Sequence, residues 1–177
     1  MSGIEISIFV ICTIFIVQRS WSSLLNIRSH GFYRFFGFEI ILVLILLNNG
    51  VWFHDPFSPV HIVSWVLLFS SLFLAIHGFR LLKIIGKPQG IIEDTTTIVT
   101  VGAYRYIRHP LYGSLLLLAW GAYLKDPLTI VGVILVTAST LSLVATAKVE
   151  ERENIDRLGS GYADYMKTTK MFIPFIL

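Results

Sequence analysis

Five long apolar stretches constrain the fold of this chain more than any other feature of its sequence. They are Ile4–Val17, Phe35–Phe53, Val60–Leu82, Leu111–Leu124 and Leu128–Ala147. A helix needs about 20 mostly apolar residues to cross a bilayer, so the first and fourth stretches need flanking residues to do so. The mean hydropathy of +0.74 and the charged fraction of 14% fit the same class of protein. The pattern predicts an all-α, polytopic integral membrane protein with about five transmembrane helices.

The basic residues are distributed unevenly between the connections. All but one of the 14 lysines and arginines fall on one side of the predicted bundle. By the positive-inside rule that side is the cytoplasm, which places the N-terminus outside and the C-terminus inside. The exception is Lys125, in the turn Lys125–Pro127 that joins the last two stretches as a helical hairpin. This distribution explains the basic pI without a nucleic-acid partner.

Several other classes of protein find no support. The chain has no Pro-, Gly- and Ser-rich linker and no internal repeat. We therefore expect one membrane domain, 1–177, with three helices in 1–85 and a second half, 86–177. The order of charges around the first stretch, Glu5 before it and Arg19 after it, disfavours a signal peptide. A single cysteine and the absence of HExxH, Walker and GxGxxG motifs give no support for a metal site, a nucleotide hydrolase or a Rossmann oxidoreductase.

Polar residues collect in two segments of the predicted cytoplasmic side, 83–110 and 148–177. The first segment leads into the stretch YRYIRHPLYG at 104–113, in which Pro110 suits the first turn of a helix. The unpaired N–H groups of that turn would form a seat for a carboxylate or phosphate. The basic side chains beside them are Arg105, Arg108 and His109. The alternative is that these residues only extend to the lipid headgroups.

An acidic pair, Glu150 and Glu151, follows the last apolar stretch on its helical continuation. The hairpin returns this pair to the level of the basic stretch. The pair can face a ligand, form a salt bridge with Arg105 or Arg108, or lie on a solvated helix face. Tyrosines gather on the same side, where they can stack on a ring, face a cation or belong to an interfacial belt. They are Tyr104, Tyr106, Tyr112, Tyr162 and Tyr165.

Three further residues are weaker candidates. Glu39 is a charge within the second stretch, which makes it a site hypothesis by default, although Arg34 is a possible ion-pair partner. His77 and Arg80 share a helix face, from which they can reach a cytoplasmic pocket or simply mark the end of the helix.

The segment from about Gly86 to Ile176 resembles the isoprenylcysteine carboxyl methyltransferase family and the related phospholipid N-methyltransferases. The matching motifs are GxYRYxRHPxY at 102–112, the KDP turn, the Glu-Glu pair and the GxxYxxY at 159–165. Two departures are the sequence GSGYADY where the family commonly has GEEYxxY, and Lys170-Met171-Phe172 where a basic residue, Val and Pro are frequent. These departures affect the expected identity of the methyl acceptor more than the expected binding of the cofactor.

The resemblance implies methyl transfer from S-adenosylmethionine to a lipophilic acceptor in the membrane, such as an isoprenylcysteine-like carboxylate. The pocket is expected between the last helical hairpin and the C-terminal helix. The implied cofactor-binding residues are Tyr104, Arg108, His109, Pro110, Tyr112, Glu150, Glu151, Tyr162 and Tyr165. The implied catalytic residues are Arg105, Arg108, Glu150 and Glu151. Alternatives are a phospholipid amine N-methyltransferase, an NADPH-dependent sterol-type reductase and a non-enzymatic scaffold.

Overall fold

The computed structural model describes residues 2–89, 92 and 94–175. The segment that resembles the methyltransferases includes Gly90, Ile91, Glu93 and Ile176, which lie outside the described residues. The described part contains no β-strand, only two isolated bridges. The all-α prediction is confirmed. The α-helices are α1 (Gly3–Leu24), α2 (His30–Leu47), α3 (Pro59–Leu81), α4 (Pro110–Tyr123), α5 (Ile130–Leu158) and α6 (Ser160–Thr168).

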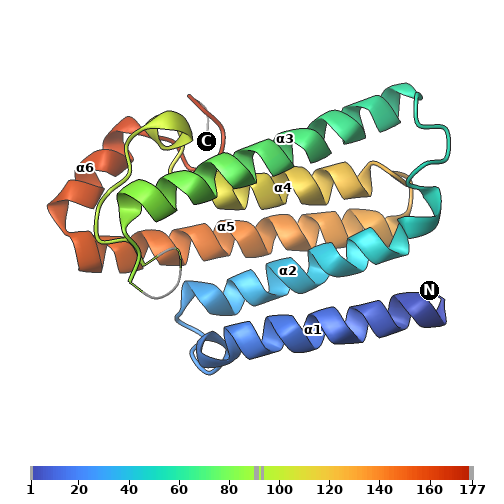
Figure 1. Ribbon diagram of the computed structural model, residues 1–177, viewed down its shortest axis with the longest axis horizontal. Helices are drawn as coiled ribbons and strands as arrows, with labels where there is room; N and C mark the ends of the chain where they lie inside the picture. The colour runs from blue at the N-terminus through green and yellow to red at the C-terminus, as the bar shows by residue number, and fades with distance from the viewer. Residues whose placement is uncertain (1, 90–91, 93, 176–177) are drawn as a thin grey trace.

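The helices α1 to α5 run alternately in opposite directions and form one elongated bundle (Figure 1). The α2–α3 and α4–α5 connections lie at one end. The α1–α2 connection, the long α3–α4 connection, α6 and the tail lie at the other (Figure 1). Four of the described helices, α1, α2, α3 with its extension to Gly86, and α5, are long and apolar enough to cross a membrane. The chain is therefore an integral membrane protein whose polar segments gather at one end of the bundle.

The fourth predicted span coincides with a helix, whereas the second ends earlier than predicted. The fourth is the 14-residue helix α4, which is about 21 Å long at 1.5 Å per residue and is shorter than the roughly 30 Å of hydrocarbon. Protein covers much of it, because Ala119 and Ala122 are fully buried. The second ends at Leu47, six residues before the predicted Phe53. The reason is Asn48, whose buried amide donates to the Ala122 carbonyl at 2.8 Å and turns the chain.

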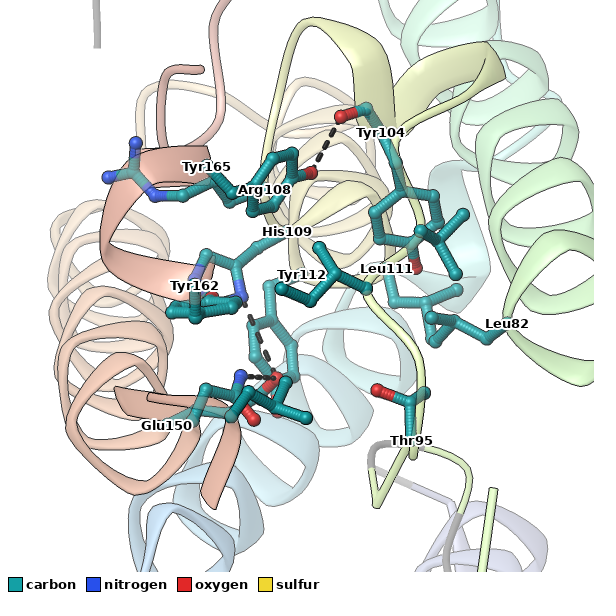
Figure 2. A pocket seen from close by; sticks show the side chains of 14 residues that line it. Leu82, Thr95, Tyr104, Arg108, His109, Leu111, Tyr112, Glu150, Tyr162 and Tyr165 are labelled. Carbon is teal, nitrogen blue, oxygen red and sulfur yellow. Dashed lines mark hydrogen bonds and ion pairs between the residues drawn. The ribbon is translucent and has the colours of Figure 1, made fainter. Parts of the chain in front are cut away.

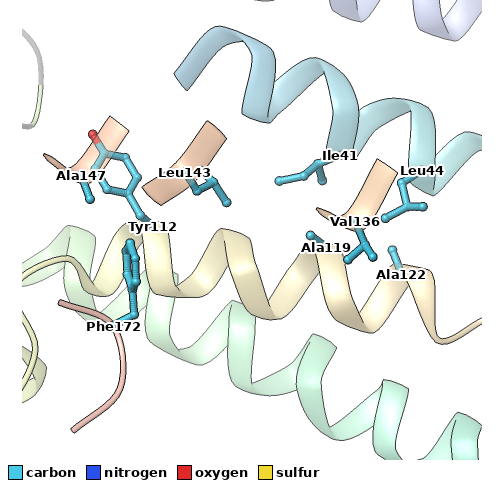
Figure 3. Packing of buried hydrophobic residues seen from close by; sticks show 9 residues of the cluster. All are labelled: Ile41, Leu44, Tyr112, Ala119, Ala122, Val136, Leu143, Ala147 and Phe172. Atoms are coloured by element: carbon cyan, nitrogen blue, oxygen red, sulfur yellow. The ribbon is translucent and has the colours of Figure 1, made fainter. Parts of the chain in front are cut away.

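The apolar core lies where α2, α4 and α5 meet (Figure 3). Leu44 of α2 and Val136 and Leu143 of α5 are almost completely buried there. Small residues on α4 let the larger side chains of both neighbours approach its backbone. Tyr112 and Phe172 extend the same cluster towards the polar end of the bundle. The core therefore fixes α4 and α5 relative to each other just where the polar segments begin.

The α3–α4 interface depends on a close approach at Gly121. Its carbonyl accepts a hydrogen bond from the Ser64 hydroxyl at 2.6 Å. A Cβ at Gly121 would lie 2.9 Å from the Leu68 Cγ and 3.3 Å from the Leu68 backbone nitrogen. We expect Gly121→Ala to lower the free energy of unfolding by about 1–3 kcal/mol, as overpacking does. The measurement is unfolding in mild detergent.

Gly113→Ala is the matched control for this substitution. A Cβ at Gly113 on the same helix would be 3.5 Å from the nearest atom, an ordinary contact. Alanine is preferred over glycine within a helix, so this variant should be unchanged or more stable by up to about 1 kcal/mol. Equal effects of the two substitutions would mean that the α3–α4 approach at Gly121 is not tight.

The Lys125 turn at the opposite end is compact, as the sequence predicts. The lysine side chain is buried and its Nζ stands 3.5 Å from the centroid of the Trp65 ring. This cation–π contact holds the α4–α5 hairpin against α3.

Candidate active site

A pocket opens at the polar end of the bundle between α4, α5, α6 and the end of the α3–α4 connection (Figure 2). The space between its side chains is about 500 Å³, including the part open to solvent. The cavity itself is only about 50 Å³, which is below the range of small-molecule sites, so a ligand requires the lining side chains to move apart. The residues that line it are Leu82, Thr95, Ile98, Val99, Tyr104, Arg108, His109, Leu111, Tyr112, Glu150, Asn154, Leu158, Tyr162 and Tyr165.

Gly102 starts the turn that brings Tyr104 to the pocket. Its φ of +59° is a conformation that residues with a Cβ rarely adopt, and a Cβ there would meet the His77 Nε2 at 2.5 Å. His77 Nε2 also accepts a hydrogen bond from the Ala103 backbone N–H at 3.4 Å. The short 3₁₀-helix η3 (Gly102–Arg105) is thereby held against α3. His77 therefore supports the site from outside the pocket.

The C-terminal tail packs back on the bundle and completes the site. The Arg108 N–H donates to the Lys170 carbonyl at 2.7 Å, and the His109 N–H donates to the Met171 carbonyl at 3.2 Å. The Tyr165 hydroxyl of α6 donates to the Tyr104 carbonyl at 2.6 Å (Figure 2). These bonds join the RYIRHP segment to a part of the chain more than 50 residues away.

Arg108 forms the strongest polar contacts of this junction. Its Nε donates to the Glu151 carboxylate at 2.7 Å, and both side chains are about 10% exposed. Its Nη1 donates to the carbonyls of Met166 and Thr169. His109 Nε2 is 3.3 Å from the same Glu151 oxygen. The salt bridge between Arg108 and Glu151, one of those that the sequence allowed, is therefore present. Glu151 and most of the Arg108 guanidinium are thus occupied in holding the C-terminal tail.

Glu150 faces the pocket with a different set of neighbours. Its carboxylate accepts hydrogen bonds from the Tyr112 hydroxyl and, at 3.5 Å, from the Asn154 amide. The nearest basic group is the His109 imidazole, whose Nδ1 is 3.9 Å from the Glu150 Oε1. Glu150 is only 9% exposed. A buried carboxylate without a bonded cation is costly, so the pocket is suited to a ligand that brings a positive charge.

The tyrosines of α6 contribute neutral donors. Burial, with smaller contributions from Glu150 and Glu151, raises the pKa of the Tyr162 phenol. Burial also raises the pKa of the Tyr165 phenol. Both phenols therefore stay protonated at neutral pH. They can donate hydrogen bonds, and they cannot serve as phenolate bases there.

Comparison with known proteins decides the family. The sequence model of the family described as phospholipid methyltransferase matches residues 59–157, which is more than half of the chain. The chain belongs to the phospholipid methyltransferase family. The resemblance inferred from the motifs is confirmed. The matched residues run from the start of α3 nearly to the end of α5, so the match includes the RHP stretch and the Glu-Glu pair.

Curated relatives of this family member are methanethiol S-methyltransferases. Methanethiol S-methyltransferase 1 of Bradyrhizobium diazoefficiens is 29% identical over 138 residues, 73% of this chain and 47% of the relative. Methanethiol S-methyltransferase of Crocosphaera subtropica is 26% identical over 125 residues, 68% of this chain and 47% of the relative. The chain spans about half the length of these relatives.

The structure brings most of the predicted site residues together. Pro110 starts α4 and Glu151 lies behind Arg108 and His109, so both adjoin the pocket without lining it. Arg105 is exposed, with its guanidinium 5.8 Å from the centroid of the Tyr106 ring, and it does not line the pocket. The predicted site residues that line it are Tyr104, Arg108, His109, Tyr112, Glu150, Tyr162 and Tyr165. Glu39 lies apart from the pocket and accepts a hydrogen bond from Thr13 of α1 at 2.8 Å.

Sequence reasoning missed Asn154 and the apolar wall of the pocket. Asn154 is buried one helical turn after Glu150, a spacing that places both on one face and would have pointed to it. Thr95 and Val99 come from the α3–α4 connection, whose path no local pattern predicts. Among the described residues no group of three or more His, Cys, Asp or Glu side chains is arranged to hold a metal ion.

Proposed function

We propose that this protein transfers a methyl group from S-adenosylmethionine to a lipophilic acceptor at the membrane surface. Membership of a methyltransferase family supports the reaction class. The observation that carries the proposal is the buried Glu150 carboxylate, which faces the pocket while Arg108 is engaged by Glu151. A cationic ligand group would complete the charge balance of that pocket.

The residues of the pocket fit the two signs of charge and the ring of this methyl donor. Glu150 would accept from its ammonium group or its ribose hydroxyls. His109 and the start of α4, which has no side-chain cap, are the groups suited to its carboxylate. Leu82, Val99 and Leu158 form an apolar wall for an aromatic base. When bound, S-adenosylmethionine supplies an electrophilic methyl group on a sulfonium.

The chain itself then has to orient the reactants and exclude water. No covalent nucleophile is required. A carboxylate acceptor needs no general base, whereas an amine or a thiol must lose a proton before it reacts. Glu150 is the candidate base for such an acceptor, because the other buried carboxylate of the pair, Glu151, is already bonded to Arg108. Arg105, exposed on the surface, is proposed to contact the acceptor only if the acceptor extends beyond the pocket.

An apolar cleft provides a route for the acceptor from the bilayer. It lies along α4 between α3 and α5 and ends at Phe172 of the tail. Gly113 lines the cleft and directly follows Tyr112, which lines the pocket. Phe172 also lies 6.2 Å from the His109 ring, between centroids. An acceptor with an apolar body would enter sideways along this cleft, while the methyl donor enters from the aqueous side.

A thiol is the second candidate acceptor. The observation in its favour is that the relatives that match this chain are named methanethiol S-methyltransferases. The same apolar cleft would admit a small hydrophobic thiol. We further propose that the chain is one domain, since no linker or repeat divides it, and that its pocket and C-terminus lie in the cytoplasm with its N-terminus outside, on the charge distribution.

Calorimetric titration of the detergent-purified protein tests the proposal. S-adenosylhomocysteine should bind saturably to one site per chain, and NADPH should give no binding heat. Binding of NADPH alone would instead support a reductase. If neither ligand binds, the pocket is not a cofactor site and the proposed function is wrong.

A further inference from the structure

A second groove lies on the outer face of α3, outside the pocket described above. Its floor is apolar, with Ile76 and Phe79 of α3 and Leu111 at the start of α4. Its rim carries Arg80 and Lys83. The spacing of these α3 residues, i, i+3, i+4 and i+7, places them on one stripe of the helix. The last turn of this stripe belongs to η2 (Leu82–Gly86), a π-helical segment of a kind often found at functional sites.

The two cations of this groove have no counter-charge among the residues that the structure describes. Arg80 and Lys83 are exposed, and within the part of the chain that the structure describes neither has a hydrogen-bond or ion-pair partner. None of the described residues that line the groove is acidic. Ile76 and Phe79, beside them, are about half exposed. An apolar floor under two unpaired cations is complementary to a ligand with an anionic head and an apolar body.

The depth of the groove fits the headgroup level of a bilayer. Helix α3 begins at Pro59, and Arg80 stands about 30 Å along the axis from it at 1.5 Å per residue. That distance is about the thickness of the hydrocarbon. With Pro59 at the opposite surface of the bilayer, Arg80 and Lys83 fall at the headgroup level, and Ile76 lies one helical turn deeper, towards the acyl chains.

We propose that this groove is a binding site for an anionic phospholipid of the surrounding leaflet. Its phosphate would lie between Arg80 and Lys83, and an acyl chain would run along Ile76 and Phe79. Gly78 lets the start of α4 pack close to α3, since a Cβ there would be 3.2 Å from a Leu111 methyl. Leu111 is a wall of both this groove and the pocket. The bound lipid is thus a neighbour of the pocket, and the proposal does not depend on the reaction catalysed there.

Native mass spectrometry of the detergent-purified protein tests this site. Dioleoyl phosphatidylglycerol and dioleoyl phosphatidylcholine are titrated separately, and the variants are R80Q/K83Q and the matched control K148Q/R152Q. Lys148 and Arg152 are exposed basic residues of α5 near the same end of the bundle. The wild type should retain one phosphatidylglycerol in preference to phosphatidylcholine. R80Q/K83Q should weaken this binding about 30-fold, because each basic residue contributes about fivefold near an anionic surface.

The control variant should bind phosphatidylglycerol within about threefold of the wild type. Three results would overturn the proposal: equal binding of the two lipids, wild-type affinity in R80Q/K83Q, or an equal loss in K148Q/R152Q. Displacement of the lipid by millimolar inorganic phosphate would also overturn it, because the groove would then hold a free anion rather than a lipid.

Discussion

Replacing Arg108 with glutamine is expected to lower the free energy of unfolding by about 3–5 kcal/mol, because it leaves a buried carboxylate without its cation. Arg108 is bonded to Glu151 through Nε and to the carbonyls of Met166 and Thr169 through Nη1. The loss should release the tail as well, since these contacts fasten it to the RHP stretch. Unfolding in mild detergent measures the first effect, and protease cleavage of the C-terminal segment measures the second.

Arg105→Gln is the matched control for this prediction. Arg105 is the same residue type three positions earlier, and it is exposed beside Tyr106. Its removal should change stability by no more than about 0.5 kcal/mol. The double variant R108Q/E151Q should be more stable than R108Q, because the unpaired charge has gone. Equal losses in R105Q and R108Q would contradict the structural role assigned to Arg108.

The second large effect is expected at Glu150. Glu150→Gln should weaken S-adenosylhomocysteine binding about 100-fold, because the variant removes the buried carboxylate that would hold the ammonium or ribose of the ligand. The amide keeps the size of the side chain, so the fold should remain. Calorimetric titration of the purified variant measures the affinity.

Glu153→Gln provides the comparison on the same helix. Glu153 is bonded to His30 at the start of α2 and does not line the pocket. Its loss is expected to affect stability while leaving the affinity for S-adenosylhomocysteine within about twofold. A comparable loss of affinity in both variants would mean that Glu150 acts through the fold rather than on the ligand.

Local pattern predicted the helices and the family, because apolar runs and motif spacing are properties of short stretches. The tyrosines of the pocket and His109 were found in this way, and the family match covers the motif that contains Tyr104, His109 and Tyr112. The sequence could not place the boundary of α2. Asn48 ends that helix by bonding to Ala122, a residue far along the chain.

The different roles of neighbouring charges were also beyond sequence reasoning. Consecutive helical residues point about 100° apart, so Glu150 faces the pocket while Glu151 faces Arg108. The rotation of α5 in the core decides which of the two glutamates faces the pocket and which faces Arg108. Likewise, local sequence does not show which of Arg105 and Arg108 forms the salt bridge, because only docking of α6 and the tail on the RHP stretch brings the Met166 and Thr169 carbonyls to Arg108.

Transfer of labelled methyl from S-adenosylmethionine tests the central claim most directly. The purified wild type is incubated with membrane lipid extract or with methanethiol, and label is counted in extracted lipid and in volatile dimethyl sulfide. The account predicts label in one of these products with the wild type and a loss of about 100-fold or more with Glu150→Gln. No transfer to either acceptor, or undiminished transfer by Glu150→Gln, would contradict it.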